Sequence, residues 1–236
     1  MQRLYLVIGL TALSLVIGCS SGGKGPASKQ ERAAERMIAA SEGHLAPVYG
    51  PLAEQIVRDY DLKRAEGVGL DIGSGPGTLI VELCKRTQMH WINVDINPHF
   101  FGYFLDRAAE AGCSCCVSAV QADVHHLPFR DGYAQMIVSR GSYRFWNDKV
   151  RAFSEIHRVL RPGGVAFIGR GLPRDFPLKL AGKVRSGHPM NYDPQQKAAE
   201  LQSIMRQLGI EDYRIIVPDK GKAEGINYGV WIEFRK

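Results

Sequence analysis

Three glycines at alternate positions, with an acidic residue just before them, form the most informative motif of this sequence. The segment LDIGSGPGTL, residues 70–79, places Gly73, Gly75 and Gly77 directly after a short apolar stretch. Glycines in such a turn let the backbone approach a bound nucleoside-like ligand closely. Asp71 stands two residues before the first glycine. A carboxylate there accepts hydrogen bonds from an ammonium group but repels a pyrophosphate.

The loop departs from the glycine pattern of dinucleotide-binding proteins. Thr78 occupies the place of that pattern's third glycine, and Pro76 removes a backbone N–H that a pyrophosphate could use. Two further acids follow in order, since Asp95 ends the apolar segment WINVD and Asp123 follows the next one. Asp71, Pro76 and the missing third glycine together favour a ligand with an ammonium group and without a pyrophosphate.

These residues resemble motif I and the acidic positions of the class I S-adenosylmethionine-dependent methyltransferases, over residues 48–234. The resemblance implies S-adenosyl-L-methionine as cofactor, with Asp95 on the ribose hydroxyls and Asp123 on the adenine amino group. Val124 would lie beside the adenine ring. The implied cofactor-binding residues are Asp71, Gly73, Ser74, Gly75, Gly77, Asp95, Ile96, Asp123, Val124 and Ser139.

The acceptor and the catalytic residues are not specified by a motif. Residues 139–142 read SRGS, where related enzymes acting on amines carry an Asn/Asp-Pro-Pro-Tyr type of motif. Arg140 either holds an anionic acceptor or forms a structural ion pair. The position of His125 and His126 favours packing beside the cofactor over acid–base catalysis. Methyl transfer needs alignment and a dry site more than an acid or a base, so we assign no catalytic residue.

Short apolar segments alternate with helical patterns along most of the chain. Strands are expected at VGLDI, HWINVDI, CCVSAVQAD, YAQMIVS and GVAFIGR, and helices within residues 31–60, 79–86, 98–111, 148–160 and 194–208. YRIIVP and INYGVWIEF, joined by a short loop, are expected to pair as a hairpin. The pattern predicts an α/β fold with a doubly wound, Rossmann-like sheet of seven strands, mostly parallel with a C-terminal antiparallel hairpin.

Residues 171–193 interrupt this pattern, because they have no clear period. The segment follows the fifth predicted strand, at the edge of a parallel sheet where ligands are usually bound. It is either a substrate-recognition insertion or an ordinary exposed connection. Its basic residues are Arg174, Lys179, Lys183, Arg185 and His188.

Composition narrows the possible partners. The chain has 236 residues and a formal net charge of +6, which suits an anionic substrate or a membrane surface. Basic and aromatic residues are not interleaved as on a nucleic-acid platform, so no nucleic acid is expected. The cysteines lack the paired spacings of a zinc site, and no metal is expected. The close group Cys113, Cys115 and Cys116 is interpreted as packing, with a soft metal or an arsenical as the alternative.

The N-terminus resembles a bacterial lipoprotein signal peptide. Residues 1–18 combine a basic start with an apolar run that is short for a membrane span, and Cys19 follows VIG as in a lipobox. The resemblance implies cleavage before Cys19, its lipidation, and a protein of the bacterial cell envelope. Residues 19–30 would form a flexible tether and residues 31–236 the methyltransferase domain. The alternative is an uncleaved helix with the domain facing the cytoplasm, favoured by the basic residues after the apolar run.

Two functions of different kinds follow. The first is methyl transfer to a small-molecule acceptor by a membrane-tethered enzyme. The second is a non-catalytic, membrane-anchored binding protein that keeps the methyltransferase fold, in a compartment where the cofactor is not made. The three acids Asp71, Asp95 and Asp123 favour cofactor binding in either case. A nicotinamide dehydrogenase is a more remote third hypothesis.

Overall fold

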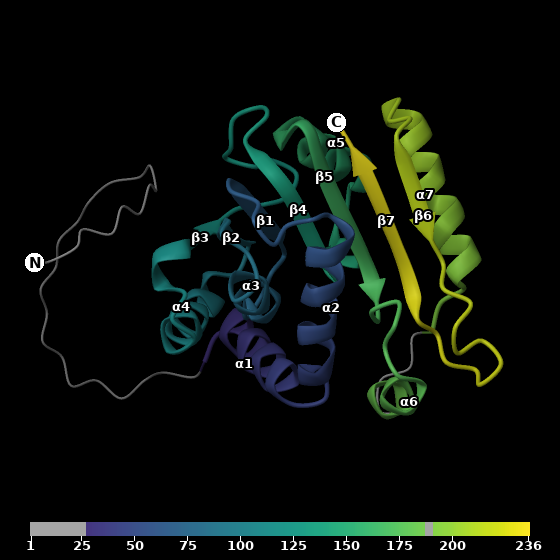
Figure 1. Cartoon of the computed structure of the whole chain (residues 1–236), viewed down its shortest axis with the longest axis horizontal. Helices are drawn as coiled ribbons and strands as arrows, with labels where there is room; N and C mark the ends of the chain where they lie inside the picture. Colours follow the sequence, from purple (N-terminus) through teal and green to yellow (C-terminus); the bar gives the residue numbers. More distant parts are fainter. Residues whose placement is uncertain (1–26, 187–190) are drawn as a thin grey trace, which may run out of the picture.

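A seven-stranded sheet runs through the middle of the computed structural model, which describes residues 27–186 and 191–236 (Figure 1). The strands lie in the order β3-β2-β1-β4-β5-β7-β6, in which β1 to β5 are parallel and β7 is antiparallel to both its neighbours. The predicted fold is confirmed. The strands are β1 Val68–Ile72, β2 His90–Asp95, β3 Val117–Gln121, β4 Ala134–Arg140, β5 Leu160–Gly171, β6 Tyr213–Ile216 and β7 Gly229–Arg235.

Helices cover both faces of this sheet (Figure 1). One face packs against α2 to α4, and the opposite face against α5 and α7, each through its own apolar cluster. Because both faces are buried, the central strands are apolar along nearly their whole length. The helices are α1 Lys29–Glu42, α2 Ala46–Asp59, α3 Thr78–Cys84, α4 Phe101–Glu110, α5 Lys149–Val159, α6 Leu178–Ser186 and α7 Pro194–Leu208; the 3₁₀ turns are η1 Pro98–Phe100, η2 Ser114–Cys116 and η3 Tyr143–Phe145.

Local sequence signals set several of the helix ends. Ser28 and Glu31 form a capping box at the start of α1. The side chains of Asp148 and Asp193 accept backbone N–H groups at the starts of α5 and α7, and Gly209 ends α7 in the left-handed conformation. These caps explain why the helices predicted for residues 148–160 and 194–208 appear nearly as expected.

Helix α6, inside residues 171–193, was not predicted. It is short, and within the described part of that segment it buries only Ala181 and Val184 of its own residues. These pack with Leu172, Phe176 and Tyr228 in a small apolar cluster. Two buried residues are too few to give a helical period in the sequence, so the helix depends on this tertiary contact.

The carboxyl ends of the five parallel strands meet at one edge of the sheet. Helices α1 and α6 both lie at this edge, at the bottom of Figure 1. Ligands of doubly wound proteins bind outside such an edge. The predicted signal peptide and Cys19 fall outside the described residues. Within residues 27–186 and 191–236, no helix combines the length and apolarity needed to cross a bilayer.

Candidate active site

A cavity of about 580 Å³ opens at the carboxyl edge of the sheet. Its wall is made by the segments that follow β1 to β5, together with residues of α1, α2 and α6. Eight of the ten residues predicted to bind the cofactor line it: Asp71, Gly73, Ser74, Gly75, Asp95, Ile96, Asp123 and Val124.

The glycine loop after β1 is held in place from both sides. The N–H of Gly73 donates to the carbonyl of Val94 at 2.7 Å, and the side chain of Asn93 donates to the carbonyl of Gly75 at 3.0 Å. Gly73 has φ of +65°, and a Cβ there would lie 2.3 Å from the Cβ of Ser142. Only glycine fits at this position, so the loop presents bare backbone to the cavity.

Asp71 ends β1 with an unsatisfied carboxylate oxygen. Its side chain is 3% exposed, and Oδ2 accepts a hydrogen bond from the Ser74 hydroxyl at 2.8 Å. Oδ1 is buried and has no partner among the described residues. Burial raises the pKa of Asp71 to about 7, and the charge of Asp95 adds to this, whereas Ser74 and Arg140 act in the opposite direction. A cationic group bound in the cavity would satisfy Oδ1 and restore the carboxylate.

Asp95 is the last residue of β2, and Ile96 follows it; both line the cavity. The two carboxylate oxygens of Asp95 accept the backbone N–H groups of Gly75, at 2.8 Å, and Asn97, at 2.9 Å. These bonds fix the carboxylate, and each oxygen keeps a further lone pair for a ligand hydroxyl. Burial raises the pKa of Asp95. Ile96 is 59% exposed, which leaves its apolar side chain available to a planar ring.

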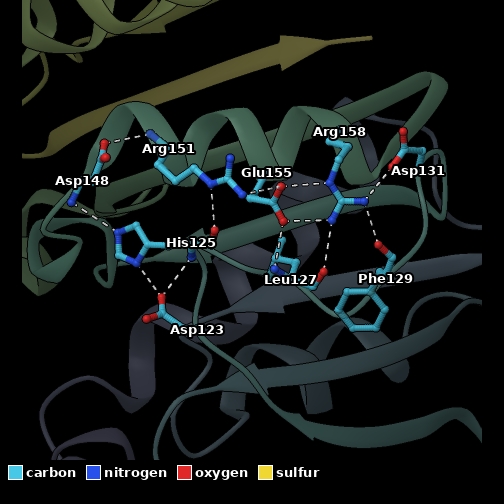
Figure 2. Close-up of polar contacts among 9 residues, drawn as sticks. All are labelled: Asp123, His125, Leu127, Phe129, Asp131, Asp148, Arg151, Glu155 and Arg158. Atoms are coloured by element: carbon cyan, nitrogen blue, oxygen red, sulfur yellow. Dashed lines mark hydrogen bonds and ion pairs between the residues drawn. The ribbon is translucent and has the colours of Figure 1, made fainter.

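Asp123 follows β3 and is engaged by His125 (Figure 2). Its Oδ1 accepts the His125 N–H at 2.9 Å and lies 2.5 Å from Nδ1, while Nε2 accepts the N–H of Asp148 at 3.3 Å. The pKa of Asp123 is lowered, first by the backbone N–H of His125. Both ring nitrogens of His125 have hydrogen-bond partners, so this side chain helps to orient the loop that carries Asp123.

Two residues of α5 fasten the rest of this loop (Figure 2). Glu155 accepts the N–H of Leu127 at 3.0 Å, and Arg158 donates to the carbonyls of Leu127 and Phe129 at 3.1 and 2.8 Å. The hydrogen bond from Arg158 holds the pKa of Glu155 below its ordinary value. The loop carrying Asp123 is thus attached to α5, which packs in the same apolar cluster as Val124 and Leu127.

Gly77 and Ser139, the other two residues predicted to bind the cofactor, are not among the described residues that line the cavity. A Cβ on Gly77 would lie 2.1 Å from the buried ring of Phe104, so this glycine permits packing between α3 and α4. Ser139 is 1% exposed, and its hydroxyl lies 2.6 Å from that of Ser142. Both residues support the glycine loop from outside the cavity.

Four arginines also line the cavity. Arg140 comes from the end of β4, Arg144 from η3, Arg170 from the end of β5 and Arg185 from α6. Among the described residues no carboxylate lies within 4.0 Å of any of them, so the ion pair considered for Arg140 is absent there.

Several lining residues carried no signal in the sequence. Met37 comes from α1, His44 from the turn after it and Tyr49 from α2, because these helices pack across the cavity. The strand that carries Arg170 was predicted, and a residue second from the end of a parallel strand reaches the ligand-binding edge of the sheet. This position was the only sequence signal for Arg170, which otherwise resembled the surface arginines.

The close group of cysteines lies near the amino end of β3, away from the carboxyl edge that carries the cavity. Cys113 is buried, which fits the packing interpretation, whereas Cys115 is exposed with its sulfur 3.2 Å from that of Cys116. Burial raises the pKa of the neighbouring Cys84 thiol. No set of side chains with metal-binding geometry occurs in the part of the chain that the structure describes.

The sheet and its acid-lined cavity define the class I methyltransferase fold. A family model described as a methyltransferase domain matches residues 70–168. A solved structure from Methanococcus maripaludis, described as a candidate S-adenosyl-L-methionine-dependent methyltransferase, is 31% identical with a TM-score of 0.77. The match covers 91% of this chain and 97% of that one. The chain belongs to the family of S-adenosyl-L-methionine-dependent methyltransferases.

Curated relatives match over shorter stretches. YdaC of Bacillus subtilis, described as an uncharacterized methyltransferase, is 25% identical over 118 residues, which are 50% of this chain and 62% of YdaC. The ubiquinone/menaquinone biosynthesis C-methyltransferase UbiE of Vibrio campbellii is 35% identical over 40% of this chain and 38% of its own. Mouse NDUFAF5, named an arginine-hydroxylase, is 34% identical over 48% of this chain and 31% of its own. The chain aligns with only part of each relative, and their named activities differ.

Proposed function

We propose that this protein is an S-adenosyl-L-methionine-dependent methyltransferase (EC 2.1.1.-) that acts on a small-molecule acceptor. The observation that carries the proposal is the buried, unpartnered Oδ1 of Asp71 beside a loop where a Cβ would not fit. S-adenosyl-L-methionine has an ammonium group for this oxygen and a ribose for Asp95, and it supplies a methyl group on a positively charged sulfur. Ile96 and Val124 offer an apolar place for its adenine.

The chain's own part in the reaction is to align the acceptor and exclude water. Aromatic and apolar side chains from α1, η1 and η3 enclose the cavity, which favours a reaction in which positive charge disappears. The three carboxylates of the described wall, Asp71, Asp95 and Asp123, all lie on the glycine-loop side. We therefore expect an acceptor whose attacking atom is already deprotonated when it binds.

Calorimetric titration of the full chain with S-adenosyl-L-methionine tests this function. Binding is expected, and Asp95→Ala should weaken it at least about tenfold because a fixed hydrogen-bonding carboxylate is lost. A folded protein that shows no binding at millimolar cofactor would overturn the proposal. Unchanged binding by Asp95→Ala would reject the residue assignment alone.

The alternative is a binding protein without turnover, and the lipoprotein-like leader is what favours it. The two functions separate when the protein is incubated with methyl-labelled cofactor and a small-molecule extract of bacterial cells. Transfer of label to an extract component supports the enzyme. Binding of the cofactor without transfer, under conditions where Asp71→Asn weakens that binding, supports the alternative.

We also propose that Cys19 is lipidated and anchors the domain to a membrane of the cell envelope. The support is the leader sequence, together with the polar residues 19–27 between Cys19 and Ser28, the N-cap of α1; this helix begins at Lys29, two residues before the predicted start of the domain. Radiolabelled palmitate should mark the full chain but not the Cys19→Ala variant. Label that survives this substitution would reject the lipobox. Protease treatment of spheroplasts would separate an outward-facing domain from one in the cytoplasm, since only the former is digested.

A further inference from the structure

We infer that the methyl acceptor carries at least two negative charges, which Arg140, Arg144, Arg170 and Arg185 bind. The inference rests on the proposed function, because it assigns the acceptor side of the same cavity. The sequence suggested an anionic acceptor only through the net charge and Arg140, and the inference adds a charge of at least two and the residues that bind it. The class comprises phosphate or diphosphate esters and compounds with two or three carboxylates.

The four guanidinium groups converge from four separate elements of the fold. Burial and then the positive charges of Arg140 and Arg170 lower the pKa of Arg185 to about 10. Burial and the charge of Arg170 likewise lower the pKa of Arg144. The groups are therefore close enough to repel one another within a partly buried cavity. An arrangement of this kind costs folding free energy, and a bound anion would reverse that cost.

No acidic side chain neutralises this cluster. Among the described residues none of the four arginines forms an ion pair, and residues 1–26 and 187–190 contain no Asp or Glu in the sequence. Arg174, from the same 171–193 segment as Arg185, shows the contrast, since its guanidinium contacts Asp59 at 2.9 Å outside the cavity wall. The fold pairs the arginine that lies outside the cavity and leaves those inside unpaired.

Uncharged groups position the arginines instead. The guanidinium carbons of Arg140, Arg144 and Arg170 lie 5.1, 4.2 and 5.8 Å from the ring centres of Tyr49, Phe145 and Tyr192, respectively. The Nε of Arg185 donates to the carbonyl of Asn227 at 3.0 Å. Such contacts orient a guanidinium without satisfying its charge.

Two of the arginines also have buried donors to spare. The Nε of Arg140 and the Nη2 of Arg185 have no hydrogen-bond partner among the described residues. An unsatisfied buried donor is costly, and anionic oxygens are its strongest acceptors.

The number of arginines sets the charge of the ligand. Arg140 is electrostatically coupled to Asp71, so it lies nearest the part of the cavity assigned to the cofactor's amino acid moiety. Even if the cofactor's own carboxylate engages Arg140, the other three arginines carry more positive charge than an acceptor with a single carboxylate could neutralise. Phosphates and polycarboxylates present several anionic oxygens to such forks at once.

The test is calorimetric titration of the full chain, without cofactor, with inorganic pyrophosphate, citrate and acetate. Pyrophosphate or citrate should bind at least about tenfold more tightly than acetate, and Arg185→Met should weaken that binding at least about tenfold. The matched control is Lys183→Met on the exposed face of the same helix, which should change nothing. Tighter pyrophosphate binding would indicate a phosphorylated acceptor, and tighter citrate binding a polycarboxylate.

Equal binding by the parent protein and Arg185→Met would overturn the inference, as would displacement of bound pyrophosphate by S-adenosyl-L-methionine. Arg144→Met provides a second variant, because Arg144 is exposed and its loss should not disturb folding. Loss of cofactor binding with intact pyrophosphate binding would reject the proposed function alone. Intact cofactor binding with no anion preference would reject only the inference.

Discussion

The two halves of the cavity are built in opposite ways. The half formed by the segments after β1, β2 and β3 carries the three acids and bare glycine backbone, fixed by short hydrogen bonds such as that from Gly75 to Asp95 at 2.8 Å. The half formed after β4 and β5 and by α6 carries four unpaired arginines, placed by aromatic rings and a carbonyl. The acidic half, fixed by hydrogen bonds, suits the proposed cationic cofactor. The basic half suits the proposed anionic acceptor.

The largest effect should come from the backbone of the acidic half. Gly77 and Gly141 both have positive φ, +70° and +87°, but only at Gly77 would a Cβ meet a buried ring, that of Phe104. Gly77→Ala should therefore lower the free energy of unfolding by about 3 kcal/mol, from backbone strain and overpacking together. Gly141→Ala, on the basic side, should cost about 1 kcal/mol from the backbone alone. Equal losses in chemical denaturation would show that the packing against Phe104 does not matter.

Asp71→Asn should weaken binding of S-adenosyl-L-methionine by about tenfold to a hundredfold, because a buried hydrogen bond to a charged group is worth about 1.5–3 kcal/mol. Ser74→Ala is the control, since it removes only the hydroxyl that donates to the other carboxylate oxygen. Its effect should be several-fold smaller. A Ser74→Ala loss as large as that of Asp71→Asn would mean that loop geometry, rather than the charge, holds the cofactor.

Cofactor affinity should also depend on pH. The pKa of Asp71 is about 7 in the free protein, and a bound ammonium group would lower it, so binding releases a proton near and below neutrality. Affinity should rise with pH up to about 7 and fall by up to about tenfold for each pH unit below it. Titrations from about pH 5.5 to about pH 7.5 measure this slope. Asp71→Asn should flatten it, and an unchanged slope in that variant would assign it to another group.

A smaller effect is expected outside the cavity, where α5 holds the loop of Asp123. Glu155 is 6% exposed, and its hydrogen bond from Arg158 lowers its pKa in the folded state. A lowered carboxyl pKa stabilises the fold above the unfolded-state pKa, and this contribution is lost as pH falls through the folded-state value. Glu155→Gln should thus cost about 1 kcal/mol at neutral pH and less in acid. Glu110→Gln, which removes an exposed ion pair with Arg107, should cost under about 0.5 kcal/mol.

The acidic half could be predicted from sequence, because its residues follow the ends of successive strands and the strands themselves were recognisable. Asp71, Asp95 and Asp123 all reach the cavity for this reason. The same reasoning did not show that Gly77 and Ser139 lie outside the cavity lining, since a position within a motif does not say which way a residue faces. Whether the eight lining residues bind the cofactor stays a prediction.

The basic half could not be predicted, because its residues meet only after folding. Arg185 belongs to a helix whose formation depends on contacts with Phe176 and Tyr228, and Arg144 belongs to a short 3₁₀ turn. Helix α1 reaches the cavity through packing that leaves no mark on its sequence pattern. Among the charged residues of 171–193, nothing but folding distinguishes Arg185 from the exposed Lys183.

A crossed titration tests the division of the cavity most directly. The full chain, Asp71→Asn and Arg185→Met would each be titrated with S-adenosyl-L-methionine and, separately, with inorganic pyrophosphate. Asp71→Asn should weaken only the cofactor and Arg185→Met only the pyrophosphate, each by about tenfold or more. If both substitutions weaken both ligands by the same factor, the cavity has one undivided binding site and the account is wrong.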